Sequence, residues 1–301
     1  MRKGQITIGL FDSGVGGLSV LRQLESYFTT CGEAESYRFL YLGDTARLPY
    51  GNRPSQEIKV FVEEIVSWLV DKGADQIVMA CNTSAALAYS VACAQAKVPV
   101  FDLIRPTAEH LAKSMQGKQK IGVLATNSTA KSQAFSKAIR EFTSDLEVIE
   151  IGCPELVGIV ESGAINADET KKILLKYASQ LEKACVDSVV LGCTHYPFLA
   201  GPLSALLPSN VQLVDPAALM VRSLSKNRST QTVLLDEASD VEITKEIYVT
   251  GPLADFAASA QVCLGQAPDT IYGITIQDLQ KARSQSQQAV LPVADISGAL
   301  S

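Results

Sequence analysis

The chain contains one short pattern twice, and this repeat limits the folds that it can adopt. Residues 8–11 (IGLF) match residues 121–124 (IGVL), and residues 78–81 (VMAC) match residues 190–193 (VLGC), at offsets of 113 and 112 residues. Each match is an apolar run of strand length, and amphipathic stretches separate the runs. Strands that alternate with helices predict a parallel sheet with crossover helices. Their recurrence at nearly one spacing indicates two similarly built units.

The length of the chain fits this duplication, because 301 residues exceed what one hydrophobic core usually organises. We therefore expect an α/β fold of two similar lobes with mainly parallel sheets, related by a pseudo-two-fold axis, with the active site in the cleft between them. The first lobe is expected to contain residues 1–103 and 216–281, and the second lobe residues 104–215. Residues 282–301 are rich in Ser, Gln and Ala and remain an unassigned C-terminal tail.

Apolar runs and helical periodicity mark the individual elements. Strands are expected at residues 6–11, 37–44, 76–80, 120–125, 147–151, 187–192, 230–235 and 242–250. Helices are expected from Leu18 onward, at residues 55–72, at 254–264, and at 168–185 with Ile173, Tyr177 and Leu181 facing inward. The glycines after the first strand lack the third small residue of a dinucleotide-binding fingerprint, so they indicate a tight turn into a helix.

Composition excludes several classes of protein. Hydrophobic residues make up 47% and charged residues 19%, as in a globular protein with a filled core. A net charge of -6 argues against nucleic acid as a partner, because its binders concentrate Lys and Arg on one face. The sequence shows neither a signal peptide nor an apolar stretch of membrane-spanning length, so we expect a cytoplasmic protein without a membrane partner. An anionic small molecule stays possible, since helix N-termini can hold carboxylates.

The seven cysteines are expected to be reduced thiols, because an odd count without C-x-x-C spacing fits neither a disulfide framework nor a zinc site. Five of them are expected to be small buried hydrophobic residues: Cys31, Cys93, Cys153, Cys185 and Cys263. Cys81 and Cys193 each follow a strand where a helix should begin, and helix N–H groups would lower a thiol pKa from about 8.5 toward neutrality. From the residues alone, a chemical role and simple burial are equally good interpretations of these two cysteines.

Four motifs carry a resemblance to a known family: FDSGVGGLSVL at residues 11–21, YLGDTARLPYG at 41–51, ACNTSA at 80–85 and LGCTHYPFL at 191–199. With these motifs in this order, the chain resembles the glutamate racemases of the aspartate/glutamate racemase family, from about residue 6 to residue 264. The resemblance implies an isomerase that interconverts L- and D-glutamate without a cofactor or metal. It also implies D-glutamate supply for peptidoglycan, hence a role in cell-wall biogenesis and cell shape, and the homodimer common in the family.

The resemblance also implies roles for individual residues. Cys81 and Cys193 would be the two acid/base groups. Asp12 and Ser13 would line the site, and the substrate contacts would include Tyr50, Gly51, Asn82, Thr83, Thr126, Thr129, Thr194 and His195. Glu161 falls where the family carries a carboxylate near the second cysteine.

Racemisation suits such a pair of thiols, because the α-proton must leave one face of the carbon and another must arrive on the opposite face. Asp12 would assist Cys81, and His195 with Glu161 would assist Cys193. Each helper also has a structural interpretation: Asp12 can cap the glycine turn, His195 can be a hydrogen-bonded core residue, and Glu161 can be a solvated helix residue.

Three other functions remain open at this point. The substrate could be aspartate or another amino acid. Cys193 and His195 could instead form a nucleophile and its base, although Cys81 would then have no role. A two-lobed protein that binds an amino acid without chemistry is the non-enzymatic alternative.

Overall fold

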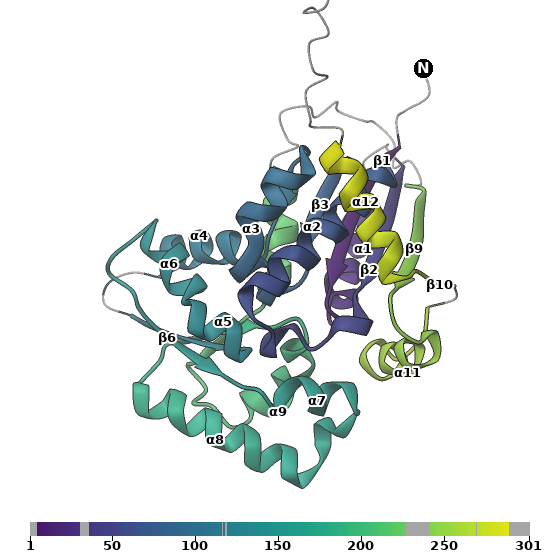
Figure 1. Cartoon of the computed structure of the whole chain (residues 1–301). Coiled ribbons are helices and arrows are strands. Elements are labelled where there is room, and N and C mark those ends of the chain that lie inside the picture. Colours follow the sequence, from purple (N-terminus) through teal and green to yellow (C-terminus); the bar gives the residue numbers. More distant parts are fainter. Residues whose placement is uncertain are drawn as a thin grey trace, which may run out of the picture.

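The computed structural model of the protein describes residues 5–30, 36–115, 117, 119–226, 241–268 and 270–288. Two β-sheets organise these residues, and Figure 1 shows them in two lobes, one above the other. The larger sheet has the strand order β10-β9-β2-β1-β3-β4, and the smaller sheet has the order β6-β5-β7-β8. All described pairings are parallel, so the predicted α/β fold with two mainly parallel sheets is confirmed.

The strands of each sheet come from separate stretches of the chain. The larger sheet contains β1 (Ile6–Asp12), β2 (Tyr37–Gly43), β3 (Gln76–Met79), β4 (Val100–Phe101), β9 (Ile243–Val249) and β10 (Ile271–Gly273). The smaller sheet contains β5 (Lys120–Ala125), β6 (Glu147–Gly152), β7 (Ser188–Gly192) and β8 (Gln212–Val214). We call the larger sheet with its helices the first lobe and the smaller sheet with its helices the second lobe. The exact domain boundaries stay a prediction.

Strand register confirms the repeat seen in the sequence. The order β2-β1-β3-β4 of the first lobe is repeated as β6-β5-β7-β8 in the second. Leu10 lies opposite Val78 in the first sheet, and the matching residues Val123 and Val190 lie opposite each other in the second. The two lobes therefore share strand order, direction and register at their centres.

Helices cover the sheets, and they include the four expected from the periodicity of the sequence. The first lobe carries α1 (Leu18–Thr30), α2 (Ser55–Asp71), α3 (Asn82–Ala96), α11 (Leu253–Leu264) and α12 (Ile276–Gln288). The second lobe carries α5 (Asn127–Ser132), α6 (Ala134–Arg140), α7 (Leu156–Glu161), α8 (Asp168–Ala184) and α9 (Ala200–Ser204). Two further helices follow the strands β4 and β8: α4 (Ile104–Ser114) and α10 (Pro216–Lys226). The four expected helices are α1, α2, α8 and α11. In Figure 1 the yellow helix α12 lies over α2, and α8 forms the lower edge of the second lobe.

Side chains of β2 show how one strand serves two cores. Phe39 and Tyr41 belong to the core that includes α1, whereas Leu40 and Leu42 belong to the core that includes α2. Successive strand residues point to opposite faces, so a run of apolar residues is needed where helices cover both faces of a sheet.

The burial predictions were correct in part. On α8, Tyr177 and Leu181 are buried as predicted, Ile173 is partly buried against the same core, and Leu174 is also fully buried. Cys153 and Cys263 are buried as predicted, but Cys93 and Cys185 are exposed.

The reasons for the two exposed cysteines are local. On α3 the buried alanines Ala88, Ala92 and Ala96 recur every four residues, which turns Cys93 outward. Cys185 ends α8 in a left-handed conformation with φ 55°. Cys31 and the strand predicted at residues 230–235 lie outside the described residues.

The C-terminal region contains more structure than the sequence indicated. Helix α12 continues to Gln288, so residues 282–288 of the unassigned tail are helical, and Leu279 and Ala282 are buried in the core that includes α2. Across the residues that the structure describes, no helix has both the length and the apolar character needed to cross a membrane.

Candidate active site

Cys81 and Cys193 lie just beyond the carboxyl ends of equivalent strands, β3 and β7. Ligands of open parallel sheets bind at this edge. A cavity of about 30 Å³ lies there, and both lobes line it with the residues Asp12, Ser13, Leu48, Pro49, Tyr50, Gly51, Cys81, Asn82, Thr83, Val157, Glu161, Cys193, Thr194 and His195. Both cysteines are nearly enclosed, with 5% of Cys81 and 7% of Cys193 exposed. The two thiols therefore face one small space from different lobes.

Cys81 caps the N-terminus of α3. Its carbonyl accepts hydrogen bonds from Ser84 Oγ at 2.9 Å and from the backbone N–H of Ala85 at 3.0 Å. Burial raises the pKa of the Cys81 thiol to about 12, the negative charge of Asp12 adds to this rise, and hydrogen bonding from Ser84 opposes it. The prediction that the helix brings this pKa toward neutrality is thus wrong, because desolvation of a thiolate outweighs the helix N–H groups.

Cys193 is followed by a turn and a short 3-10 helix, Tyr196–Leu199, rather than by an α-helix. Its Sγ lies 3.7 Å from Nδ1 of His195, and Nε2 of His195 lies 3.1 Å from Oε1 of Glu161. Burial alone lowers the pKa of His195, but its hydrogen bonds with Cys193 and Glu161 reverse the effect and raise that pKa well above the usual value. A protonated imidazole can donate to both neighbours at once. The structure thus brings together three residues predicted to act as a unit.

Asp12 ends β1 and joins the two lobes. Its Oδ1 accepts from the backbone N–H of Gly14 at 2.8 Å, so the carboxylate does cap the glycine turn. Its Oδ2 accepts from Thr194 Oγ1 at 3.2 Å. Burial raises the pKa of Asp12, whereas the positive charge of His195 lowers it. Both interpretations of Asp12 therefore fit the geometry: it shapes the turn, and it places a charge in the site.

The threonines of the predicted substrate set form a hydroxyl cluster. Thr83 Oγ1 lies 2.9 Å from Thr126 Oγ1 and 3.2 Å from Thr129 Oγ1. Thr83 lines the cavity, whereas Thr126 and Thr129 are absent from its lining and contact the hydroxyl of Thr83. In this closed arrangement the two threonines orient the hydroxyl of Thr83, because all three hydroxyls bond to one another.

Glycine is required where backbone approaches the site. A Cβ on Gly16 would lie 2.4 Å from Thr194 Oγ1 and 2.6 Å from His195 Nδ1. A Cβ on Gly51 would lie 2.7 Å from the Cβ of Thr126. Gly16 of the glycine turn and Gly51 therefore allow the two lobes to pack closely beside the cavity.

Asn82 has a buried side-chain carbonyl oxygen, Oδ1, that accepts no hydrogen bond from the described residues. Its side chain lines the cavity, and only 3% of the residue is exposed. A buried acceptor without a partner is unfavourable by roughly 1–3 kcal/mol. The carbonyl of Asn82 is therefore suited to accept from a ligand N–H group.

Three cavity residues were not predicted: Leu48, Pro49 and Val157. Leu48 and Pro49 directly precede Tyr50 in a motif already linked to the site, so their proximity could have been inferred. Val157 lies four residues before Glu161 on α7, which places both side chains on one helical face.

Residues 8–224 match the family model described as Asp/Glu/Hydantoin racemase. The chain belongs to this family. The predicted family and the predicted enzyme class, an amino-acid racemase, are confirmed.

Relatives of this family resemble the chain over most of its length. A glutamate racemase of Trichodesmium erythraeum is 40% identical over 265 residues, which cover 88% of this chain and 94% of the relative. One from Trichormus variabilis is 42% identical over 278 residues, covering 91% of each chain.

Solved structures of this racemase family share the fold. Glutamate racemase from Thermus thermophilus, in complex with β-chloro-D-alanine, has 31% identity and a TM-score of 0.78, and covers 92% of this chain and 100% of its own. The enzyme from Francisella tularensis, in complex with D-glutamate, has 27% identity and a TM-score of 0.77, and covers 90% of this chain and 97% of its own.

Proposed function

We propose that the protein is a glutamate racemase that interconverts L- and D-glutamate by proton transfer at the α-carbon without a cofactor. The observation that carries the proposal is the presence of two thiols, Cys81 and Cys193, in one cavity between two equivalent half-structures. The relatives named glutamate racemase support the choice of substrate.

The environments of the two thiols suit opposite protonation states at the start of a turnover. Cys81 is held as a thiol by burial and by the charge of Asp12. Cys193 lies beside His195, whose protonated ring would stabilise a thiolate. In one direction Cys193 takes the α-proton and Cys81 S–H delivers its proton to the opposite face. The product leaves with Cys193 protonated and Cys81 as thiolate, which is the starting state for the reverse direction.

Polar groups of the cavity would bind the amino acid and stabilise the carbanion. The substrate ammonium can donate to Asn82 Oδ1 and to the carboxylate of Asp12. Hydroxyl and backbone donors near Ser13, Thr83 and Thr194 can contact its carboxylates. A cavity of about 30 Å³ is too small for glutamate, so it must widen before substrate enters; in this proposal the lobes separate and then close again to exclude solvent.

The biological role follows from the product. D-glutamate would serve peptidoglycan biosynthesis, and thereby cell-wall biogenesis and cell shape. A cytoplasmic location suits a mechanism that needs two reduced thiols. The homodimer and the lobe boundaries at residues 103–104 and 215–216 belong to the same proposal.

The decisive experiment incubates the purified protein with L-glutamate in heavy water and analyses the product on a chiral column. We expect D-glutamate with deuterium at the α-carbon. Cys81→Ser and Cys193→Ser should each abolish racemisation, while Cys93→Ser, at an exposed thiol of the helix that Cys81 caps, should not. Racemisation of aspartate but not of glutamate would show that aspartate is the substrate. Binding without deuterium exchange would favour the binding-protein alternative, and a trapped acyl-enzyme would favour Cys193 as a nucleophile.

A further inference from the structure

One wall of the cavity is a loop with little regular structure. Between β2 and α2 the chain forms two short 3-10 helices, Thr45–Arg47 and Tyr50–Asn52, and residues 48–51 line the cavity. Short 3-10 turns have poor hydrogen-bond geometry, so they hold a fixed position only with support from elsewhere. That support comes from side chains.

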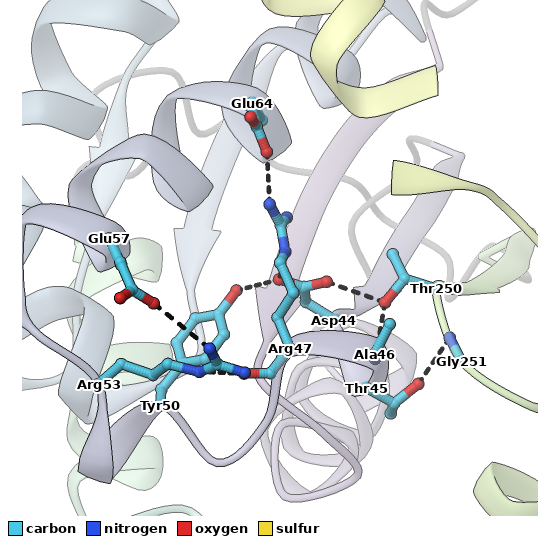
Figure 2. A network of polar contacts seen from close by, with 10 residues as sticks. All are labelled: Asp44, Thr45, Ala46, Arg47, Tyr50, Arg53, Glu57, Glu64, Thr250 and Gly251. Carbon is cyan, nitrogen blue, oxygen red and sulfur yellow. Dashed lines mark hydrogen bonds and ion pairs between the residues drawn. The ribbon is translucent and has the colours of Figure 1, made fainter. Parts of the chain in front are cut away.

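Asp44 is the centre of this support, as Figure 2 shows. The residue is completely buried. Its Oδ2 accepts from Arg47 Nε at 2.6 Å and from the hydroxyl of Tyr50. Its Oδ1 accepts from Thr250 Oγ1 at 2.8 Å, just after β9. One carboxylate thus fastens Tyr50 of the cavity wall to a distant part of the first lobe.

Arg47 extends the network to α2. Its Nη1 donates to Oε2 of Glu64, and its guanidinium lies 4.0 Å from the centre of the Phe61 ring. Only 8% of Arg47 and 3% of Glu64 are exposed. The wall is therefore held from α2 on one side and from Thr250 on the other.

The same wall touches the second lobe. Ser128 Oγ on α5 donates to the carbonyl of Gly51 at 2.7 Å, and Gly51 also packs against Thr126. The position of this loop consequently affects both the cavity and the contact between the lobes.

The free energy of buried ion pairs indicates that this network fixes the position of the loop rather than stabilises the fold. Buried ion pairs rarely stabilise a fold more than apolar side chains of the same size would, since desolvation cancels much of the attraction. Here one buried cation faces two buried carboxylates beside the cavity. We propose that Asp44, Arg47, Glu64 and Thr250 are positioning residues that fix Tyr50 and Gly51 against the substrate; this inference rests on the proposed racemase function.

Thr250 offers the cleanest test, because it lies outside the cavity lining and its hydroxyl makes the contact. Thr250→Val removes that hydroxyl, while Thr250→Ser keeps it. We expect Thr250→Val to raise KM for glutamate and lower kcat, with a loss in kcat/KM of roughly tenfold to a hundredfold. Thr250→Ser should keep wild-type values.

Glu64→Gln tests the other anchor. It should also raise KM, whereas Glu63→Gln on the same helix should not, because the ion pair of Glu63 is with Arg283 of α12, outside the network of Asp44 and Arg47. Kinetics are measured on the full chain beside its Tm and circular dichroism. A lowered Tm with wild-type KM in both Thr250→Val and Glu64→Gln would overturn the positioning role. An inactive wild type would overturn the proposed function itself, and this inference with it.

Discussion

Thr194 Oγ1 donates a hydrogen bond to Asp12 Oδ2 at 3.2 Å, and this bond crosses from the second lobe to the first. A matching contact joins Thr83 of the first lobe to Thr126 of the second at 2.9 Å. In each case a residue at or just after the end of the first strand of one half-structure meets a residue one or two positions after the cysteine of the other. The surroundings of both thiols therefore depend on how the lobes meet, so closure of the cleft would affect the proposed proton transfer directly.

Asp12→Asn should stabilise the protein at neutral pH while it removes activity. Burial raises the pKa of Asp12, so its carboxylate form is disfavoured in the folded state. A carboxyl group with a raised folded pKa stabilises the fold only at acidic pH, and this contribution is lost as the pH rises through that pKa. The amide keeps the shape without the charge. We expect Tm to rise on the order of a few degrees at neutral pH.

Activity should change in the opposite direction, with kcat/KM falling about a hundredfold or more. Differential scanning calorimetry and the chiral assay measure the two effects. Repeating the calorimetry at acidic pH provides the control, because the advantage of Asp12→Asn should disappear once the wild-type carboxyl is protonated. A variant less stable than wild type at neutral pH would contradict the argument.

Glu161→Gln should shift the pH profile of racemisation. The hydrogen bond to Glu161 is one of the causes that raise the pKa of His195. Without the carboxylate charge that pKa falls, so the imidazole loses its proton at lower pH. If the protonated ring supports Cys193, the alkaline limb of kcat/KM should move to lower pH. Glu169→Gln, at an exposed position of α8, is the matched control and should leave the profile in place.

The thiols of Cys81 and Cys193 should differ in reactivity although they are similarly buried. The pKa of Cys81 is raised to about 12, so almost none of it is thiolate at neutral pH, and only the thiolate is alkylated. Cys193 has the imidazole of His195 beside it. Brief treatment with iodoacetamide followed by peptide mass mapping should label Cys193 before Cys81. Faster labelling of Cys81 would reverse the proposed resting protonation states.

Local sequence patterns were sufficient to predict the centres of both sheets. The match between residues 78–81 and 190–193 predicted that β3 and β7 occupy equivalent places in two similarly built units. It also predicted that Cys81 and Cys193 would both face the cleft between the lobes. Helix α12 was harder to predict, since its polar sequence has only a few buried positions such as Leu279 and Ala282.

Properties that arise only when distant parts of the chain pack together could not be predicted from local sequence patterns. The raised pKa of Cys81 results from its burial and from the nearby charge of Asp12, which a strand-to-helix pattern does not report. The support of Tyr50 by Asp44 depends on Thr250, which lies 206 residues from Asp44 along the chain. The motif at residues 41–51 indicates that this segment belongs to the site, but only the folded structure shows which side chains fix its position.

Gly16 and Gly158 offer a final comparison that separates a packing requirement from chain flexibility. An added Cβ at Gly16 would lie within 2.4 Å of Thr194 Oγ1, whereas one at Gly158, inside α7, would meet no atom within 4 Å. Gly16→Ala should destabilise the fold by about 1–3 kcal/mol, because the added methyl forces Thr194 and His195 to move. It should also lower kcat, since those residues serve the cavity. Gly158→Ala should stabilise the protein by about 0.5–1 kcal/mol with unchanged kcat, because alanine loses less backbone entropy in a helix. Urea unfolding and the chiral assay on both variants test this contrast, and a Gly16→Ala enzyme with wild-type kcat would show that the two lobes tolerate a wider contact than the structure indicates.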